Sequence, residues 1–217
     1  MEKLVEKVSE YIQNKFKDSE GSHDWHHIER VWKLSKYIQQ KEGGDLLVIE
    51  LAALLHDVSD HKYNGGDWEK GSQLTSEILL DFEAPMDLIQ KIQLVVSQVS
   101  FKGAKVADLS DTVEAKIVQD ADRLDAIGAI GIARAFSYGG SKHRPLFDPA
   151  VSPILHQTAD EYKNSVSHTV NHFYEKLFLL KDRMNTITAK RIAKKRHALM
   201  EAFLEEFYSE WKVESLE

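Results

Sequence analysis

Apolar residues recur at steps of three and four along almost the whole chain. Val5, Val8, Ile12 and Phe16 form the first such stripe, and comparable stripes follow in each later part of the sequence. This spacing places apolar side chains on one face of a helix. Period-two alternation and repeats of 20–50 residues are both missing from the sequence. The pattern therefore predicts an all-α protein, and 217 residues fit one domain.

Glycine and proline mark where the predicted helices end. Breaks fall at Gly43-Gly44, residues 64–66, Pro85 and Lys102-Gly103. The longest irregular stretch is predicted from Tyr138 to Pro153, and a loop that long inside a compact domain is more often functional than idle. We therefore expect a single domain over residues 1–217, with a metal-binding core at about 20–136, a loop at 138–153 and C-terminal helices at 154–212.

Composition narrows the class of protein further. Charged residues make up 29% of the chain, and the absence of cysteine excludes disulfides and thiol nucleophiles. The first 13 residues are amphipathic rather than signal-like, and no apolar run reaches the roughly 18 residues of a membrane span. We therefore expect a cytoplasmic protein without a membrane partner. The net charge of −7 disfavours an extended nucleic-acid surface but allows a small anionic substrate.

The first candidate site lies at His56-Asp57, directly after the apolar run Leu51–Leu55. A carboxylate and an imidazole at the end of a buried helix need a partner, because burying an unsatisfied polar group is costly. A metal ion would satisfy both side chains. The alternative is an ordinary helix end at which Asp57 accepts a hydrogen bond from the backbone or pairs with a basic side chain.

A second candidate lies in the segment from Ser22 to Val31. His27 is four residues before Val31, so it shares the apolar stripe and is predicted to point inward. His26 is predicted to lie at the rim of the site, and His23, one turn before His27, stays as an alternative ligand. A histidine satisfied within the core is the competing interpretation.

The third candidate is the pair Asp122 and Asp125 on an otherwise apolar helical segment. Two carboxylates one turn apart repel each other unless a cation or an arginine compensates. The alternative is a pair of surface acids in salt bridges.

In the order His, His-Asp, Asp, these segments resemble the HD-domain superfamily of metal-dependent phosphohydrolases, and most closely its bacterial nucleotide pyrophosphohydrolases. The motifs are HDWHHIERV from His23, LLHD from Leu54 and DADRLDAIGAIGIAR from Asp120. The likeness covers most of the chain, including the loop after Tyr138 and the C-terminal helices. It implies a helical bundle around one divalent metal ion, with His27, His56, Asp57 and Asp122 as ligands. Mn²⁺ is favoured, and Mg²⁺, Co²⁺, Fe²⁺ and Ni²⁺ are alternatives.

The resemblance also suggests roles for residues around the metal. Asp60, three residues after Asp57, is the candidate to orient or deprotonate the attacking water, although it could equally be a turn residue. Asp125 is predicted to hold a metal ligand or a metal-bound water in place. Basic and neutral side chains flanking the site are candidates to bind substrate phosphates: Lys70, Lys142, His143 and Arg144.

The implied reaction is hydrolysis of nucleoside or deoxynucleoside triphosphates to monophosphate and pyrophosphate by a water that the metal activates. A nucleoside monophosphate phosphomonoesterase (5'-nucleotidase) and a non-catalytic nucleotide-binding HD module remain alternatives, whereas hydrolysis of cyclic dinucleotides or of (p)ppGpp is disfavoured. Four aromatic residues are candidates to stack on a base: Trp25, Tyr63, Trp68 and Phe136. The expected partner is a small phosphorylated substrate, and the C-terminal aromatics Tyr208 and Trp211 indicate a packing surface within the chain or in a homodimer.

Two further groups are interpreted as ordinary features. His168 and His172 are four residues apart on one predicted helix, a spacing that suits metal ligands. Without the intervening glutamate of a zinc protease we interpret them as partly exposed or substrate-edge residues. Residues 194–197 are interpreted as a solvated basic face.

Overall fold

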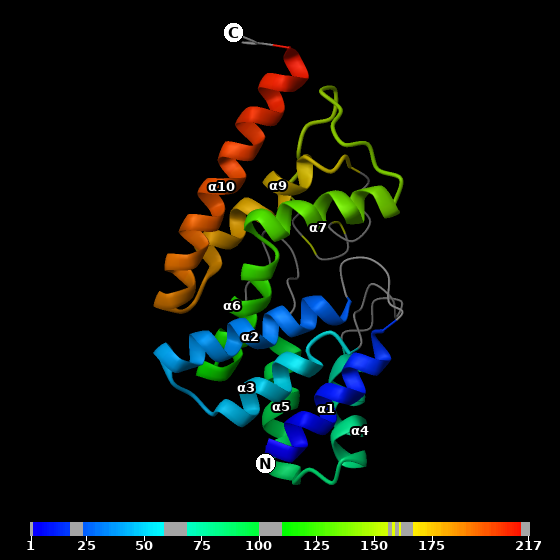
Figure 1. The fold of residues 1–217 in the computed structure, drawn as a ribbon, viewed down its shortest axis with the longest axis vertical. Coiled ribbons are helices and arrows are strands. Elements are labelled where there is room, and N and C mark those ends of the chain that lie inside the picture. Colours follow the sequence, from blue (N-terminus) through cyan, green and yellow to red (C-terminus); the bar gives the residue numbers. More distant parts are fainter. Residues whose placement is uncertain are drawn as a thin grey trace.

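A computed structural model describes residues 2–17, 24–58, 69–99, 110–155, 158, 161 and 167–213. Within these ranges every regular element is a helix, which confirms the all-α prediction (Figure 1). The elements are α1 (Glu2–Lys15), α2 (Trp25–Glu42), α3 (Leu46–Leu55), α4 (Glu69–Asp81), α5 (Met86–Val99), α6 (Val113–Asp125), α7 (Gly128–Ser141), α9 (Asn171–Glu175), the 3₁₀ helix η1 (Leu177–Arg183) and α10 (Ile187–Lys212). None of the described helices is long and apolar enough to cross a membrane.

Helix α3 forms the centre of the first half of the molecule. It is apolar on all sides, and its residues from Val48 onward are buried with the exception of Glu50. A helix without a polar face must be covered all round. Helices α1, α2, α5 and α6 pack against it for this reason. The arrangement leaves the C-terminal end of α3, where His56 and Asp57 follow, close to the start of α2 (Figure 1).

Helix α6 joins this bundle to the C-terminal helices, since it packs against α2 and α5 and also against α7 and α10. Asp120 of α6 is fully buried and accepts hydrogen bonds from the backbone of Asn185 and from the backbone and hydroxyl of Thr186, all at 2.8 Å. Thr186 is also the N-cap of α10. The start of α10 is thereby fixed to the helix that carries Asp122 and Asp125.

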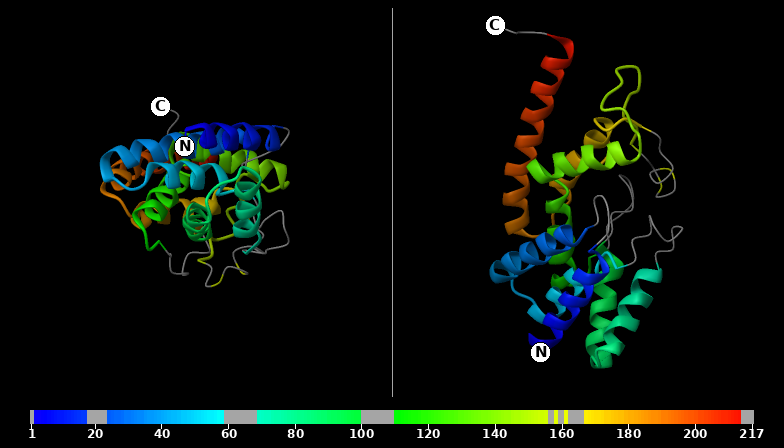
Figure 2. Two further views of the ribbon diagram at one scale, coloured as in Figure 1. Left: turned by 90° about the horizontal axis from the view of Figure 1, so that it is seen from below. Right: turned by 45° about the vertical axis from the view of Figure 1, so that its right-hand side comes forward.

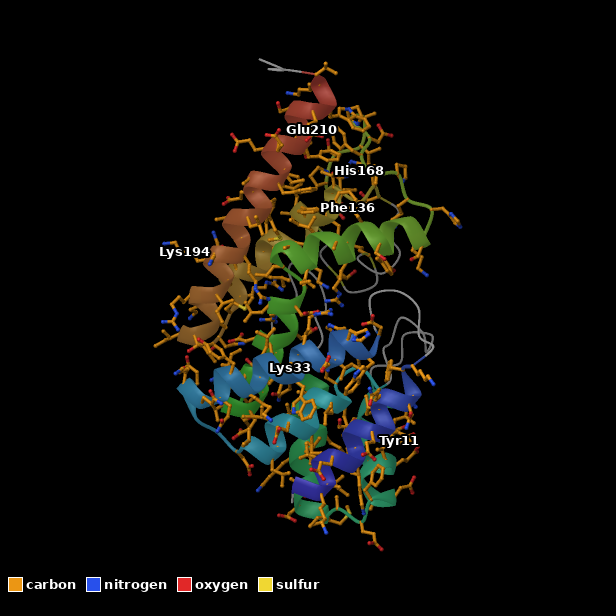
Figure 3. All side chains as sticks on the ribbon, viewed as in Figure 1. Tyr11, Lys33, Phe136, His168, Lys194 and Glu210 are labelled. Carbon is orange, nitrogen blue, oxygen red and sulfur yellow. The ribbon has the colours of Figure 1, made fainter. Side chains whose placement is uncertain are left out.

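The C-terminal helices form the second half of the molecule. Helix α7 runs across the top of α6, and α10 extends along the outer edge of the structure, as the right panel of Figure 2 shows. Phe136 of α7 lies within an aromatic cluster with Phe173, Phe203 and Phe207, at ring separations of 5.8–6.3 Å (Figure 3). Phe136 therefore packs the core, and our prediction that it stacks on a substrate base was wrong.

The predicted loop from Tyr138 to Pro153 begins later than expected. Helix α7 continues through Tyr138, Gly139 and Gly140 to Ser141, so the described loop starts at Lys142. Gly139 packs so closely on the neighbouring segment that a Cβ atom at this position would clash with the hydroxyl oxygen of Thr169. The glycine serves a close helix contact at this point rather than a turn.

Two predictions about histidines in the C-terminal part were also wrong. His168 and His172 do not share a helix, because α9 begins only at Asn171. His168 is buried, donates from Nε2 to the carbonyl oxygen of Val151 (3.1 Å), and accepts at Nδ1 from the backbone N–H of Asn171 (3.2 Å). His197 is likewise buried against Phe178 rather than part of a solvated face. Residues 154 and 155, at the start of the predicted C-terminal helices, are not helical.

Candidate metal centre

The site is built from the first turn of α2 and the last turn of α3. Asp24 is the N-cap of α2, and its carboxylate accepts a hydrogen bond from the backbone N–H of His27 at 2.8 Å. The cap fixes where α2 begins and so where His27 points, and that side chain is 1% exposed. His26, one residue earlier, is 74% exposed, as predicted for a residue at the rim.

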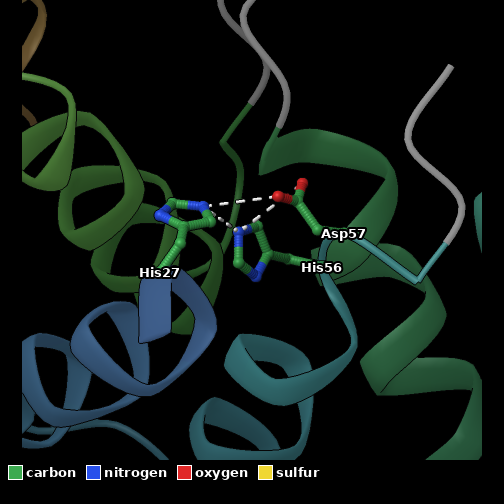
Figure 4. Close-up of side chains that lie close together, drawn as sticks. All are labelled: His27, His56 and Asp57. Atoms are coloured by element: carbon green, nitrogen blue, oxygen red, sulfur yellow. Dashed lines mark hydrogen bonds and ion pairs between the residues drawn. The ribbon is translucent and has the colours of Figure 1, made fainter. Parts of the chain in front are cut away.

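His27, His56 and Asp57 form a group that could hold a metal ion, as Figure 4 shows. The two Nε2 atoms of His27 and His56 lie 3.3 Å apart. Asp57 places one carboxylate oxygen 3.3 Å from Nε2 of His27 and the other 3.6 Å from Nε2 of His56. Two nitrogen ligands at about 2.1 Å from one ion would be separated by roughly 3.0–3.4 Å in octahedral or tetrahedral geometry, so this spacing suits a shared cation.

The protonation of the two histidines supports the same conclusion. Nδ1 of His56 lies 2.8 Å from the carbonyl oxygen of Ala53, which can only accept, so Nδ1 carries the proton. Nδ1 of His27 lies 2.7 Å from the carboxylate of Asp125 and is a donor for the same reason. With Nδ1 as the donor, each ring in its neutral form presents the lone pair of Nε2 to the other ring. A divalent cation between them is the chemical group that this donor set fits.

Asp122 of α6 lies beside the group. One of its carboxylate oxygens is 3.6 Å from Nε2 of His27 and 3.9 Å from Nε2 of His56, and its side chain is 27% exposed. It is thus the most accessible of the four predicted ligands. The structure brings all four together from three helices, and their role as a ligand set remains a prediction.

Asp125 has a different environment from Asp122. Its side chain is 2% exposed and accepts hydrogen bonds from Nδ1 of His27 (2.7 Å), from Arg30 (2.7 and 3.0 Å) and from Arg134 (2.8 Å). Burial alone would raise the pKa of Asp125. Its hydrogen bonds with His27 and Arg30, with the nearby charge of Arg134, outweigh this effect and hold the pKa well below its usual range.

The same contacts act on His27. Burial would lower the pKa of its imidazole, but hydrogen bonds to Asp125 and Asp57 outweigh burial and raise the pKa above the ordinary value of 6.5. Asp125 thus orients His27 with Nε2 toward the centre of the group and increases the basicity of that nitrogen. Such carboxylate–histidine pairs are common behind metal ligands.

Sequence reasoning missed Arg134, which lies nine residues after Asp125 and across the break between α6 and α7. The break turns at Gly128, whose φ of +80° suits glycine and where a Cβ atom would meet the side chain of Arg196. Helical spacing cannot be continued across such a turn, so only the motif ending at Arg134 could have drawn attention to it. Arg30, three residues after His27, reaches the site through Asp125, whereas Arg123, next to Asp122 in sequence, donates to the carbonyl oxygen of Arg183.

Three of the predicted phosphate-binding residues, Lys142, His143 and Arg144, directly follow the end of α7. Lys142 and Arg144 each place their charge 5.7 Å from the ring centre of Tyr138, and Lys142 and His143 are exposed. Several other predictions fall outside the described residues or side chains: His23, Asp60, Tyr63, Trp68 and the side chain of Lys70.

Comparison with known proteins gives the family. A model of the HD domain matches residues 24–127. YpgQ of Bacillus subtilis is 36% identical over 203 residues, or 93% of this chain and 91% of that protein. Its crystal structure in complex with ADP matches with a TM-score of 0.72 at 31% identity, covering 95% of this chain and 97% of that one.

Two other solved structures agree with this result. An HD-superfamily hydrolase of Bacillus thuringiensis matches with a TM-score of 0.74 at 38% identity, covering 97% of this chain and 98% of that chain. A Lactobacillus plantarum protein matches with a TM-score of 0.87 at 36% identity over 99% of both chains. The chain therefore belongs to the HD superfamily, and its relatives and its histidine–aspartate site support a metal-dependent hydrolase.

Proposed function

We propose that this chain hydrolyses nucleoside or deoxynucleoside triphosphates to the monophosphate and pyrophosphate. The observation that carries the proposal is the pair of inward-facing Nε2 atoms of His27 and His56, flanked by carboxylates of Asp57 and Asp122. When bound there, a divalent ion would polarise a phosphoryl oxygen and lower the pKa of a nearby water molecule. Mn²⁺ is our favoured ion for this mixed nitrogen and oxygen set.

The protein's own residues would prepare this chemistry. His27 and His56 hold their protons at Nδ1, away from the centre, through Asp125 and the carbonyl oxygen of Ala53. The negative charge of Asp57 would partly neutralise the ion, and the greater exposure of Asp122 leaves an approach for substrate on its side. Asp60 remains our candidate for the residue that takes the proton from the attacking water.

The choice of a nucleotide rests on a relative and on the position of basic residues. YpgQ has been crystallised with ADP. Arg134 pairs with Asp125 beside the predicted metal site, and Lys142 follows eight residues later, at the end of α7. At 1.5 Å per residue, the backbones of these two residues are about 12 Å apart along the helix axis. An extended ligand such as a nucleotide could bridge that distance, whereas inorganic phosphate could not.

The test uses metal-stripped protein supplied with Mn²⁺ and a panel of nucleoside mono- and triphosphates, with products separated by chromatography. Asp57→Ala should lose Mn²⁺ binding and turnover together. Asp81→Ala, which removes an exposed carboxylate at the end of α4, is the matched control and should retain both. Metal content measured on each protein distinguishes loss of the ion from loss of the fold, which circular dichroism checks.

The products separate the competing functions. Monophosphate with pyrophosphate, lost in Asp57→Ala, supports the proposal. Nucleoside with phosphate from monophosphates would instead assign a phosphomonoesterase. Nucleotide retained without turnover in the Mn²⁺-loaded protein would assign a binding module and overturn hydrolysis.

A further inference from the structure

The side chain of Arg196, on α10, reaches the turn between α6 and α7. Its Nη1 donates a hydrogen bond to the carbonyl oxygen of Leu124, one residue before the end of α6. Its aliphatic stem lies on Gly128, the first residue of α7, where a Cβ atom would be only 2.9 Å from Cγ of the arginine. One side chain of α10 therefore contacts both sides of the turn, where α6, α7 and α10 meet (Figure 1).

The same turn carries Asp125, the carboxylate behind His27. Asp125 is the last residue of α6 and directly follows Leu124. Arg134 donates from Nη1 to the carboxylate of Asp125 at 2.8 Å and to its backbone carbonyl oxygen at 3.3 Å. Arg134 itself lies on α7, six residues after Gly128. A change in the turn would therefore displace both Asp125 and the arginine that holds it, relative to His27.

The guanidinium of Arg196 suits this place electrostatically. Carbonyl oxygens at the C-terminal end of a helix carry partial negative charge, so a cation is stabilised there. Burial lowers the pKa of Arg196, and the negative charge of Asp125 acts in the opposite direction. The positive charge is thus close enough to Asp125 to interact with it, and we expect the side chain to be charged at neutral pH.

Helix α10 is attached to α6 at two points. Near its start, Thr186 donates from its backbone and hydroxyl to Asp120. Ten residues later, about 15 Å along the helix, Arg196 donates to Leu124. A helix held at two points cannot swing about either of them. The position of α10 therefore determines where Arg196 meets the turn.

We propose that Arg196 is a positioning residue for the metal centre, and that it acts from the C-terminal helix through the turn between α6 and α7. It holds the end of α6 so that Asp125 stays bonded to Nδ1 of His27 and directs Nε2 toward the other predicted ligands. The inference rests on the proposed metal-dependent function. It adds to that function a residue from outside the matched HD domain, which ends at residue 127.

Three variants separate the guanidinium from the rest of the side chain. R196M removes the charge and the donors but keeps an unbranched stem against Gly128. R196K keeps the stem, the charge and one donor group. R191M removes the same charge from an exposed position on the same helix and is the matched control. The carbonyl oxygen of Leu124 also accepts from the backbone of Ile127, so R196M should leave no unpaired acceptor and should fold.

The first measurement is Mn²⁺ affinity at a temperature where circular dichroism shows each variant to be folded. R196M should bind Mn²⁺ about three- to tenfold more weakly than the wild type. This is less than the 10–100-fold loss typical of a direct partner of a histidine ligand, because Arg196 acts through Asp125. R196K should recover most of the affinity, and R191M should bind within about twofold of the wild type.

The second measurement uses metal-free protein. The proton on Nδ1 of His27, 2.7 Å from the carboxylate of Asp125, should give a resolved downfield signal in proton NMR. R196M should shift or broaden this signal, whereas R191M should not. A residue that only stabilised the fold would lower the melting temperature without moving the signal.

The outcomes are distinguishable. R196M with wild-type Mn²⁺ affinity would overturn the proposal, and so would an unmoved His27 signal. R196M that is unfolded at every temperature would also overturn it, because Arg196 would then serve the fold as a whole. A wild type that binds no Mn²⁺ would instead refute the proposed function, and the His27 signal would still decide whether Arg196 positions Asp125.

Discussion

Replacing Asp125 by asparagine tests whether His27 is held ready for a metal ion. The carboxylate accepts four hydrogen bonds, one from His27, two from Arg30 and one from Arg134. The asparagine side chain would keep the shape but lose the negative charge, and its amide could donate to Nδ1 of His27. The imidazole would then move its proton to Nε2, where a metal ligand needs a lone pair.

The expected magnitude follows from the role of such partners. Loss of a carboxylate behind a histidine ligand typically weakens metal binding by about 10–100-fold, equivalent to roughly 1.4–2.7 kcal/mol. We expect an effect toward the upper end, because His27 is 1% exposed and no water can replace the lost acceptor without entering the core. Folding should survive, since Arg30 is 34% and Arg134 19% exposed and both can reach solvent.

The assay is Mn²⁺ affinity, measured from the electron paramagnetic resonance signal of the free ion. Glu50→Gln is the matched control. Glu50 lies on α3, six residues before His56, and is also mostly buried. It pairs with Lys36 and accepts a hydrogen bond from Trp32. It should bind Mn²⁺ as the wild type does. If Asp125→Asn bound Mn²⁺ within about threefold of the wild type, the account of His27 given above would be refuted.

Three further outcomes are expected. The pKa of His27 is raised in the metal-free protein, and only the deprotonated ring can bind a metal ion. Mn²⁺ affinity should therefore be full above that pKa and fall by up to about tenfold per pH unit below it. An Mn²⁺ affinity that stays constant from pH 8 to 6 would contradict this. Gly139→Ala should lower the melting temperature by several degrees, because its Cβ would meet Thr169, whereas Gly140→Ala, with open space around it, should lower it little or raise it. Leu51→Ala should cost about 2–5 kcal/mol in denaturant unfolding, since the side chain is fully buried; a cost below about 1 kcal/mol would argue against α3 as the core.

The repeating apolar stripes were sufficient to predict the helices, because burial of one helical face is a local pattern. They also predicted that His27 points inward and that His56 and Asp57 follow the end of a buried helix, as the structure confirms. Both conclusions depend only on spacing within a single helix.

Features that depend on the angle between elements could not be predicted in this way. Arg134 reaches Asp125 only because the chain turns at Gly128. The glycine at 139 looked like a helix end, but it is a contact point for Thr169, which is thirty residues away in sequence. Periodicity does not record such distant neighbours, and the same limit explains why Phe136 was misjudged.

The contact between Arg134 and Asp125 also limits how far the chain could be shortened around the predicted metal site. The HD-domain match ends at residue 127, and every predicted ligand lies before that point. A fragment cut there would retain His27, His56, Asp57 and Asp122, yet it would lack one of the two arginines that balance Asp125. The part of the chain that surrounds the predicted site therefore extends beyond the matched HD domain, and a graft of the site onto another scaffold would have to bring part of α7 with it.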